Sequence, residues 1–481
     1  MGLSIQYAPP AANRAMRYIS TRGQAAPRDF TGVLLAGLAE DGGLFVPETW
    51  PVLDDADWRA MRGLPYAEIA ARVVGLFTGD AVPEDALARM CVDSYAGFSH
   101  PAVVPLNQLD GSIWSCELFH GPTLAFKDLA MQLLGRLFDH ALTEAGRRVT
   151  IIGATSGDTG SAAIEACANR AAIDIFILHP EGRTSEVQRR QMTTVTAPNV
   201  ANVAVDGTFD DCQDLVKAMF GDAPFREAMR LSAVNSINFA RIAAQIPYYV
   251  AAALALGAPD RPVAFAVPTG NFGNVLAAWA ARRMGLPIEH LIVASNRNDI
   301  LARFLADNDM SVRAVEPSLS PSMDIAVSSN FERLLFELLG RDPEATAATI
   351  AGFRATGRMD VAHGVWRAAR AIMSPFSLDD AATLAEISRL DAAGYLADPH
   401  TAIGIAAARA WDNPDRIPVV AMATAHPAKF PDAMLAATGR RPPLPPHLAD
   451  LYQRSERYSR APADLAAVED RVRAFVLRNA A

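Results

Sequence analysis

The chain has 481 residues and a formal net charge of −9 at pH 7, with 51% hydrophobic and 20% charged residues. This composition is typical of a globular protein with two or three domains, and the negative charge disfavours a nucleic-acid partner, which selects for basic surfaces. No apolar run reaches the roughly 18–20 residues that a membrane-spanning helix needs. An anionic ligand would have to be held by local donors, because the net field of the protein does not attract it.

The beginning of the chain predicts a loose tail. Residues 1–15 are rich in Ala and Pro, lack the charged-then-apolar architecture of a signal peptide, and leave Met16 as an alternative start. The four cysteines are far apart and form no CxxC or metal-binding pattern. They are Cys91, Cys116, Cys167 and Cys212. We therefore expect reduced core thiols, a cytoplasmic location and no metal site.

Up to residue 100 the pattern is mixed, and beyond it strands and helices alternate. A polar start and a turn-rich stretch precede helical patterns around 55–78 and 83–97, and Pro101 marks a boundary. Short apolar runs then predict strands at Arg148–Ala154, Ile173–Leu178, Arg261–Val267, Leu291–Ala294 and Pro418–Ala423. Helices are expected at Ser161–Asn169, Val275–Met284 and 298–306. This alternation predicts a parallel sheet covered by helices on both faces, with ligands at the carboxyl ends of the strands.

Lysine is rare in this chain: among 44 Lys and Arg residues, only Lys127, Lys217 and Lys429 are lysines. Arginine stays protonated, whereas a lysine amine can become neutral and form a Schiff base. Lys127 has apolar neighbours at the start of a long amphipathic helix, where the helix N-terminus lowers the pKa of an amine. The alternative is a solvated lysine at a helix start. Lys217 lies on the polar face of an amphipathic helix and receives no role, and Lys429 is a weaker candidate that would neutralise an anion.

Two Gly-rich loops follow predicted strands. Gly153–Ser161 contains four hydroxyls, one carboxylate and three glycines, which suits a carboxylate or a cofactor oxygen; ordinary helix capping is the alternative. Pro268–Asn274 joins a strand to a helix, so its backbone N–H groups and the helix N-terminus predict a phosphate cradle. A tight turn is the alternative there. The chain lacks a P-loop lysine and a GxGxxG pattern in this loop, which disfavours nucleotides.

A third polar loop, Thr424–Phe430, follows the last predicted strand. A hydroxyl at a strand end can hydrogen-bond to a ring nitrogen, and a capping threonine in a polar loop is the alternative. His120 and His426 lie in candidate loops, where a histidine is more often a local hydrogen-bonding group than a catalyst. A tunable lysine together with these loops indicates a pyridoxal-phosphate (PLP) enzyme.

The motifs resemble those of the threonine synthase family, fold-type II PLP enzymes of the tryptophan-synthase-β superfamily, in its longer bacterial and fungal branch. The segments that carry the resemblance are Tyr18–Gly23, Asp41–Pro47, Phe119–Asp128, Gly153–Ser161, Cys212–Asp214, Asn235–Arg241, Gly270–Asn274, Ser320–Asp324, Asp398–Ala402 and Thr424–Phe430. The resemblance implies an α/β fold with two parallel-type sheet domains flanked by helices and an added N-terminal segment. We expect the divisions 1–100, 101–260 and 261–481, the last containing a Pro-rich surface strap at 437–449.

The resemblance also implies how the cofactor is held. Lys127 would form the Schiff base with PLP and then act as general base, and Thr424 would face the pyridine nitrogen. Asp158 would lie near the cofactor hydroxyl, where many relatives in the superfamily have asparagine. The residues implied for the cofactor phosphate are Gly270, Asn271, Phe272, Gly273 and Asn274.

The implied reaction converts O-phospho-L-homoserine and water into L-threonine and phosphate, the last step of threonine biosynthesis. The substrate carboxylate would bind at Thr155, Ser156 and Thr159. Candidates for the substrate phosphate are Asn238, Arg241, Arg183 and Ser185. We expect a small-molecule substrate and a monomer, with a dimer as the alternative.

Two rival functions are a threonine or serine dehydratase and a non-catalytic relative that binds PLP or phosphorylated ligands. The segments Tyr18–Gly23 and Asp41–Pro47 argue against the dehydratase. The presence of Lys127, the Gly270–Asn274 loop and Thr424 argues against the non-catalytic relative.

Overall fold

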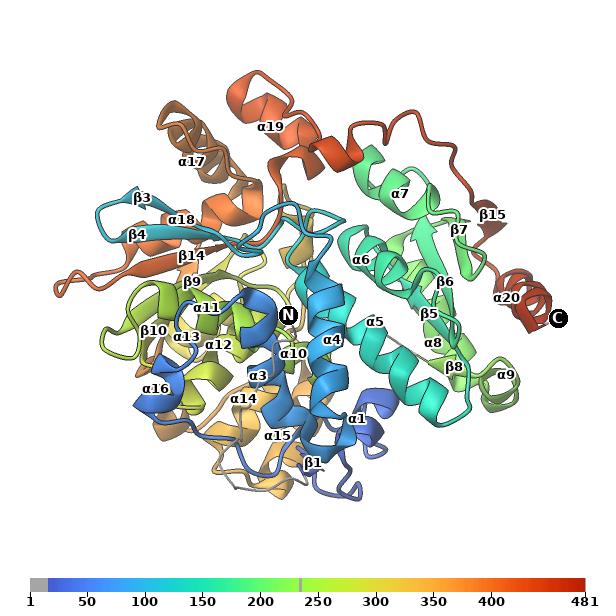
Figure 1. The fold of residues 1–481 in the computed structure, drawn as a ribbon, viewed down its shortest axis with the longest axis horizontal. Helices are drawn as coiled ribbons and strands as arrows, with labels where there is room; N and C mark the ends of the chain where they lie inside the picture. The colour runs from blue at the N-terminus through green and yellow to red at the C-terminus, as the bar shows by residue number, and fades with distance from the viewer. Residues whose placement is uncertain (1–15, 233–235, 481) are drawn as a thin grey trace, which may run out of the picture.

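The computed structural model describes residues 16–232 and 236–480 as a mixed α/β protein built on two sheets that lie side by side (Figure 1). The predicted tail at residues 1–15 and the motif residue Asn235 lie outside the described residues. None of the helices in the described part of the chain has the length and apolarity that a membrane span requires.

The first sheet has six strands in the order β13-β10-β9-β14-β4-β3, and all its pairs are parallel except β3 with β4. Its strands are β3 (Leu106–Asp110), β4 (Ile113–Glu117), β9 (Val263–Pro268), β10 (Ile288–Ser295), β13 (Met373–Ser377) and β14 (Val419–Ala423). Side chains of β9 alternate between two buried faces: Ala264 lies in a cluster with α17 (Asp380–Ala392) and α18 (Pro399–Ala410), and Phe265 lies in the main core. Helices therefore cover both faces, as the alternation of strands and helices predicts.

The second sheet has five parallel strands in the order β15-β7-β6-β5-β8. They are β5 (Val149–Ala154), β6 (Ile173–Pro180), β7 (Val200–Asp206), β8 (Leu231–Ser232) and β15 (Ser459–Pro462). All eight residues of β6 are buried, which is typical of a central parallel strand. Helices α5 (Lys127–Glu144) and α6 (Asp158–Cys167) pack with one set of its side chains, and α8 (Phe209–Gly221) and α20 (Leu465–Ala480) pack with the other.

The two sheets exchange segments of the chain. Strands β3 and β4 precede the second sheet in sequence but belong to the first, and β15 crosses from the C-terminal part to the edge of the second sheet beside β7. The connection runs from α19 (Pro431–Thr438) past α7 (Glu186–Thr193) to β15, at the upper right of Figure 1, and it contains the predicted strap. The three-part division of the chain stays a prediction.

The N-terminal segment packs helices against both α5 and α11 (Ile246–Ala255). It contains the antiparallel pair β1 (Tyr18–Ser20) and β2 (Phe45–Pro47). Its helices are α1 (Phe30–Ala36), α2 (Asp55–Arg59), α3 (Tyr66–Thr78) and α4 (Glu84–Tyr95). The helical pattern around 55–78 is thus two helices, because Gly63 takes a positive φ of 74° and Pro65 occupies the position before α3.

Other helix boundaries also differ from the predicted ones. Helix α6 begins at Asp158, three residues before the predicted start at Ser161, so the second half of the Gly153–Ser161 loop forms its first turn. Strand β10 is longer at both ends than the predicted Leu291–Ala294. Further α-helices are α9 (Ala223–Ala228), α10 (Phe239–Ala243), α12 (Gly273–Arg283), α13 (Ile300–Asp307), α14 (Phe331–Leu338), α15 (Pro343–Thr356) and α16 (His363–Arg370).

Candidate active site

Lys127 lies at the first position of α5, beside the carboxyl end of β14. The backbone N–H of Phe126 donates to the carbonyl oxygen of Thr424 at 2.8 Å, and Ala125 forms an isolated bridge with Ala425. The lysine turn and the polar loop after β14 are therefore adjacent, although they are distant in the sequence.

The turn before Lys127 is fixed by buried contacts. The Asp128 carboxylate accepts hydrogen bonds from the backbone N–H of Thr123 at 2.8 Å and from its hydroxyl at 2.6 Å. Gly121 is required by close approach, since a Cβ there would lie 2.5 Å from the Cβ of Asp128. Leu124 takes a φ of 63°, an uncommon conformation for a branched residue. Burial raises the pKa of Asp128 to about 6, against these hydrogen bonds.

The Lys127 amine points at a carboxylate and a hydroxyl. Its Nζ lies 3.5 Å from Asp158 Oδ2 and donates to Ser322 Oγ at 3.3 Å. Burial lowers the pKa of Lys127 to about 8; the charge of Asp158 opposes this effect, and those of Arg241 and Lys429 add to it. An amine with this pKa is neutral in a substantial fraction of molecules near neutral pH, as nucleophilic attack and proton abstraction require.

Asp158 is the centre of a buried polar network. Its Oδ1 accepts from Lys429 Nζ at 2.7 Å and from Gln188 Nε2 at 2.9 Å, and its Oδ2 accepts from Ser322 Oγ at 3.0 Å. Burial alone would raise the pKa of Asp158, but the charges of Lys429 and Lys127 hold it well below its usual range. Asp158 is therefore a permanent negative charge beside the Lys127 amine.

The Gly-rich loop after β9 has the shape and the free donors of an anion site. It passes through Phe272 with a φ of 62° and delivers the N-terminus of α12. Gly270 packs closely on the next segment, since a Cβ there would lie 2.7 Å from the carbonyl oxygen of Ser322. The Asn274 Oδ1 accepts from Tyr248 and Tyr249, while its buried Nδ2 has no hydrogen-bond partner among the described residues. A helix N-terminus with an unpaired buried donor is suited to a phosphate.

A second unpaired donor comes from Arg241 in α10. The Arg241 residue is 4% exposed, and its Nη1 has no hydrogen-bond partner in the part of the chain that the structure describes. Burial lowers the pKa of Arg241 to about 10, so the guanidinium remains charged at neutral pH. The charge of Arg241 adds to the effect of burial in lowering the pKa of Lys127. A buried guanidinium with a free N–H is a further group for an anion.

The other predicted substrate residues have more local roles in this structure. Thr155 is buried, and its Oγ1 accepts from the backbone N–H groups of Gly157 and Gly160 at 3.0 and 2.9 Å. Ser156 is exposed and Thr159 half-buried on the following turn. These contacts show that Thr155 shapes the loop that presents Ser156 and Thr159.

The four candidates for the substrate phosphate are not equally placed. Asn238 is buried, caps α10 and donates to the carbonyl oxygen of Leu34. Ser185 caps α7, and its hydroxyl donates to the backbone carbonyl of Lys429 at 3.4 Å. Arg183 is exposed in the loop before α7. Arg241 is the one of the four that is buried and keeps a side-chain N–H, at Nη1, without a hydrogen-bond partner among the described residues.

Two residues without an assigned chemical role in the motif analysis, Ser322 and His400, contact this network, together with Lys429, the weaker candidate for neutralising an anion. His400 Nε2 accepts from the backbone N–H of Ser322 at 3.3 Å, and its Nδ1 pairs with Asp398 Oδ2 at 2.6 Å. Ser322 is thereby held against Lys127. The rarity of lysine was a usable signal for Lys429, and the Ser320–Asp324 and Asp398–Ala402 motifs were signals for the other two.

The two loop histidines make local contacts. His426 Nδ1 accepts from the backbone N–H of Ala428 at 3.1 Å, and burial lowers the pKa of His426 to about 4. His120 pairs with Glu117 at 2.7 Å. Both therefore fit the interpretation of local hydrogen-bonding groups.

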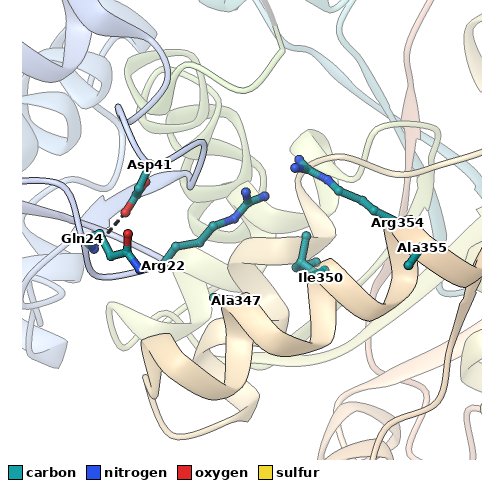
Figure 2. A pocket seen from close by; sticks show the side chains of 8 residues that line it. Arg22, Gln24, Asp41, Ala347, Ile350, Arg354 and Ala355 are labelled. Carbon is teal, nitrogen blue, oxygen red and sulfur yellow. Dashed lines mark hydrogen bonds between the residues drawn. The ribbon is translucent and has the colours of Figure 1, made fainter.

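A cavity of about 500 Å³ lies elsewhere, between the N-terminal segment and α15 (Figure 2). The side chains of Arg22 and Arg354 extend into it from opposite sides, and Asp41 accepts from the backbone N–H of Gln24. Arg22 is also paired with Glu332 at 2.9 Å. None of the predicted site residues lines this cavity.

The residues present fit a cofactor with an aldehyde and a phosphate. Lys127 supplies an amine of lowered pKa, and Asn274 and the N-terminus of α12 supply free donors for a phosphate. Thr424, 5% exposed, follows β14 and touches the lysine turn through its backbone. The donor set therefore agrees with PLP.

Comparison with known proteins points the same way. Three family models match the chain: "Threonine synthase N terminus" at residues 17–95, "Pyridoxal-phosphate dependent enzyme" at 101–373 and "Threonine synthase, C-terminal" at 401–472. The chain is 54% identical over 458 residues to the threonine synthase of Pseudomonas aeruginosa, covering 94% of this chain and 97% of that protein. It is 42% identical over 471 residues to the threonine synthase of Corynebacterium glutamicum, again covering 94% and 97%.

A solved structure extends the comparison to three dimensions. The PLP-bound threonine synthase from Brucella melitensis superposes with a TM-score of 0.94 at 50% identity, covering 96% of this chain and all of that one. The similarity therefore includes the N-terminal segment, both sheets and the C-terminal strap.

Proposed function

Because the chain belongs to the threonine synthase family of PLP-dependent enzymes, it converts O-phospho-L-homoserine and water into L-threonine and phosphate, and we propose that Lys127 performs the central proton transfers. The observation that carries the assignment is the buried Lys127 amine, with a pKa of about 8, facing Asp158 beside a phosphate cradle. This reaction belongs to amino-acid biosynthesis.

PLP, when bound, supplies the electron sink that makes the substrate Cα–H and Cβ–H bonds acidic. In our proposal Lys127 attaches the cofactor covalently, and the backbone and side chains of Gly270–Asn274 bind its phosphate. Thr424 would hold the ring nitrogen through its hydroxyl, and Asp158 would hold the ring hydroxyl. The unpaired Nδ2 of Asn274 supports the phosphate assignment.

With the cofactor and substrate bound, the free amine of Lys127 would act as general base. Its neutral amine removes protons from the substrate carbons and returns them on the correct face. Ser322 Oγ, 3.3 Å from Nζ, holds the amine in place, and the Asp398–His400 pair holds Ser322. The amine is thus positioned by three elements of the fold at once.

The substrate anions are assigned to separate donors. We assign the carboxylate to the turn of Ser156 and Thr159 that Thr155 shapes, and the phosphate to Arg241. The buried guanidinium of Arg241 with its free Nη1 supports the second assignment. Asn238 and Ser185 support this site by capping α10 and α7, and Arg183 stays a weaker candidate because it is exposed. We also propose a monomer in the cytoplasm.

The function is tested by incubating the PLP-loaded protein with O-phospho-L-homoserine and measuring phosphate and threonine in the same sample. Equal amounts of the two products are expected. Release of 2-oxobutyrate in place of threonine would contradict the assignment and favour a dehydratase.

The role of Lys127 is tested by Lys127→Ala. We expect this variant to make no threonine, because both the covalent attachment of PLP and the general base are lost. Full activity would exclude Lys127 as the reacting amine. Lys217→Ala is the matched control, since Lys217 is exposed and paired with Asp214, and it should keep wild-type activity.

A further inference from the structure

Two of the three lysines in the chain meet at one carboxylate. Lys429 Nζ lies 2.7 Å from Asp158 Oδ1, and Lys127 Nζ lies 3.5 Å from Asp158 Oδ2. The Lys429 residue is 0% exposed. Because arginine supplies nearly all other positive charges in this sequence, two buried lysines around one acid indicate a need for compact ammonium groups at this place.

Lys429 also ties together the elements that surround Lys127. Its amine donates to the carbonyl oxygen of Thr123 at 2.7 Å, and Thr123 in turn binds the Asp128 carboxylate. Lys429 therefore connects the loop after β14 to the lysine turn on one side and to α6 on the other. Both of its partners are buried, so its bonds are shielded from water and strong.

We propose that Lys429 is a positioning residue of this active site: by holding Asp158 Oδ1 at 2.7 Å, it keeps that carboxylate from forming a full ion pair with Lys127. The Lys127 amine then remains available to exchange protons with the substrate. This inference rests on the proposed function of Lys127 as general base. The Asp158 carboxylate lies 3.5 Å from Lys127 Nζ but 2.7 Å from Lys429 Nζ, so its closer ion pair is with Lys429.

The charges that face Lys127 predict the effect of removing Lys429. Asp158 on α6 raises the pKa of Lys127, and Arg241 on α10 and Lys429 lower it. Asp128 on α5 is occupied by Thr123, and Ser322 contributes only a hydroxyl. Without Lys429 one lowering charge is lost and Asp158 turns fully to Lys127, so the Lys127 amine holds its proton to higher pH.

The test compares the wild-type holoenzyme with Lys429→Gln over pH 6–10. We expect the acid limb of the pH–kcat profile of Lys429→Gln to move up by about one pH unit. The kcat of this variant should therefore fall about tenfold at pH 7 and recover to within about twofold of wild type at pH 9.5. Absorbance of the bound cofactor, which reports protonation of the Lys127 nitrogen, should shift in the same direction. Lys217→Gln, the same change on the exposed surface lysine, should leave both measurements unchanged.

Asp158→Asn provides an independent arm if Lys429→Gln does not fold. It removes the negative charge that raises the pKa of Lys127 and keeps both lysines, so the acid limb and the absorbance titration should move to lower pH. Opposite shifts in the two variants support the proposal; where Lys429→Gln does not fold, a downward shift in Asp158→Asn supports its premise that Asp158 raises the pKa of Lys127, and an unchanged Asp158→Asn titration removes that premise. A Lys429→Gln variant with a uniform loss at every pH, or with unchanged titrations, would overturn it and leave Lys429 a structural residue.

The outcomes also separate this proposal from the proposed function. A wild-type protein that makes no threonine contradicts the function itself. A wild-type protein that makes threonine, with variants whose titrations do not move, contradicts only the role of Lys429.

Discussion

At the scale of single residues, the candidate active site is defined by two buried amines that contact one buried carboxylate. Burial lowers the pKa of the Lys127 amine, and the carboxylate of Asp158 acts in the opposite direction. The same carboxylate also contacts a second buried amine, that of Lys429. Neither the sharing of Asp158 nor the contact with the Ser322 hydroxyl follows from local sequence, because the four residues come from segments that are distant in the chain. The scarcity of lysine predicts Lys127 as a candidate for chemistry and Lys429 as a weaker one, and in the structure both amines contact Asp158.

The lowered pKa of Lys127 predicts the pH dependence of cofactor attachment. Attachment needs the neutral amine, and the folded protein neutralises Lys127 above about pH 8, well below the usual range for lysine. In cofactor-free protein the rate of PLP attachment should rise about tenfold per pH unit up to about pH 8 and then level off. Rapid-mixing absorbance measurements give this profile. A rate that still rises steeply between pH 9 and 10 would show an amine with an ordinary pKa.

The close packing at Gly270 predicts that a side chain there weakens cofactor binding. In Gly270→Ala the new Cβ would lie 2.7 Å from the backbone oxygen of Ser322, which cannot move aside without shifting the Lys127 contact. We expect PLP affinity to fall at least about tenfold, measured by equilibrium titration of the cofactor. Gly352→Ala is the matched control: Gly352 lies within α15 with no atom within 4 Å of the new Cβ. It should bind PLP normally and gain about 0.5–1 kcal/mol of stability from helix propensity.

At the scale of elements, loops that follow strands carry most of the site, as the pattern of the sequence indicates. Lys127, Asp158 and the N-terminus of α12 are all at the first turns of helices. These groups therefore share a position at a helix N-terminus, which provides free N–H groups and fixes the direction of the side chains. The start of α6 was predicted three residues late, because Asp158-Thr-Gly has the composition of a loop while its backbone is already helical.

The segment between α19 and β15, which contains most of the predicted strap, has a small apolar cluster of its own. Leu448 and Leu451 pack with Val187 of α7 and with Leu124 of the lysine turn. We expect Leu451→Ala to lower the free energy of unfolding by about 3 kcal/mol, because Leu451 is fully buried. Denaturant unfolding measures the change. Leu477→Ala on α20, where the side chain is 66% exposed, should change stability by no more than about 0.5 kcal/mol, and equal losses in the two variants would contradict this packing.

At the scale of the whole molecule, the α/β class and the parallel sheets were predictable from alternating apolar runs and Gly-rich loops. The order of the strands was not, because β14 lies between β9 and β4, and nothing in the local pattern of Val419–Ala423 specifies its neighbours. Strand β3 was missed because its residues are largely exposed, so it lacks an apolar run. The crossing of β15 to the second sheet is likewise a long-range pairing that periodicity does not encode.

The exchanged strands have a consequence for how the chain is made. During synthesis β3, β4 and β9 emerge long before β14, which must enter between β4 and β9, so the first sheet stays incomplete until residue 423 has left the ribosome. The second sheet likewise keeps the edge of β7 open until β15 arrives. A translation product that stops early therefore exposes unpaired strands to proteases and chaperones, and has no assembled Lys127–Asp158–Lys429 network. The fold thus links catalytic competence to completion of the polypeptide.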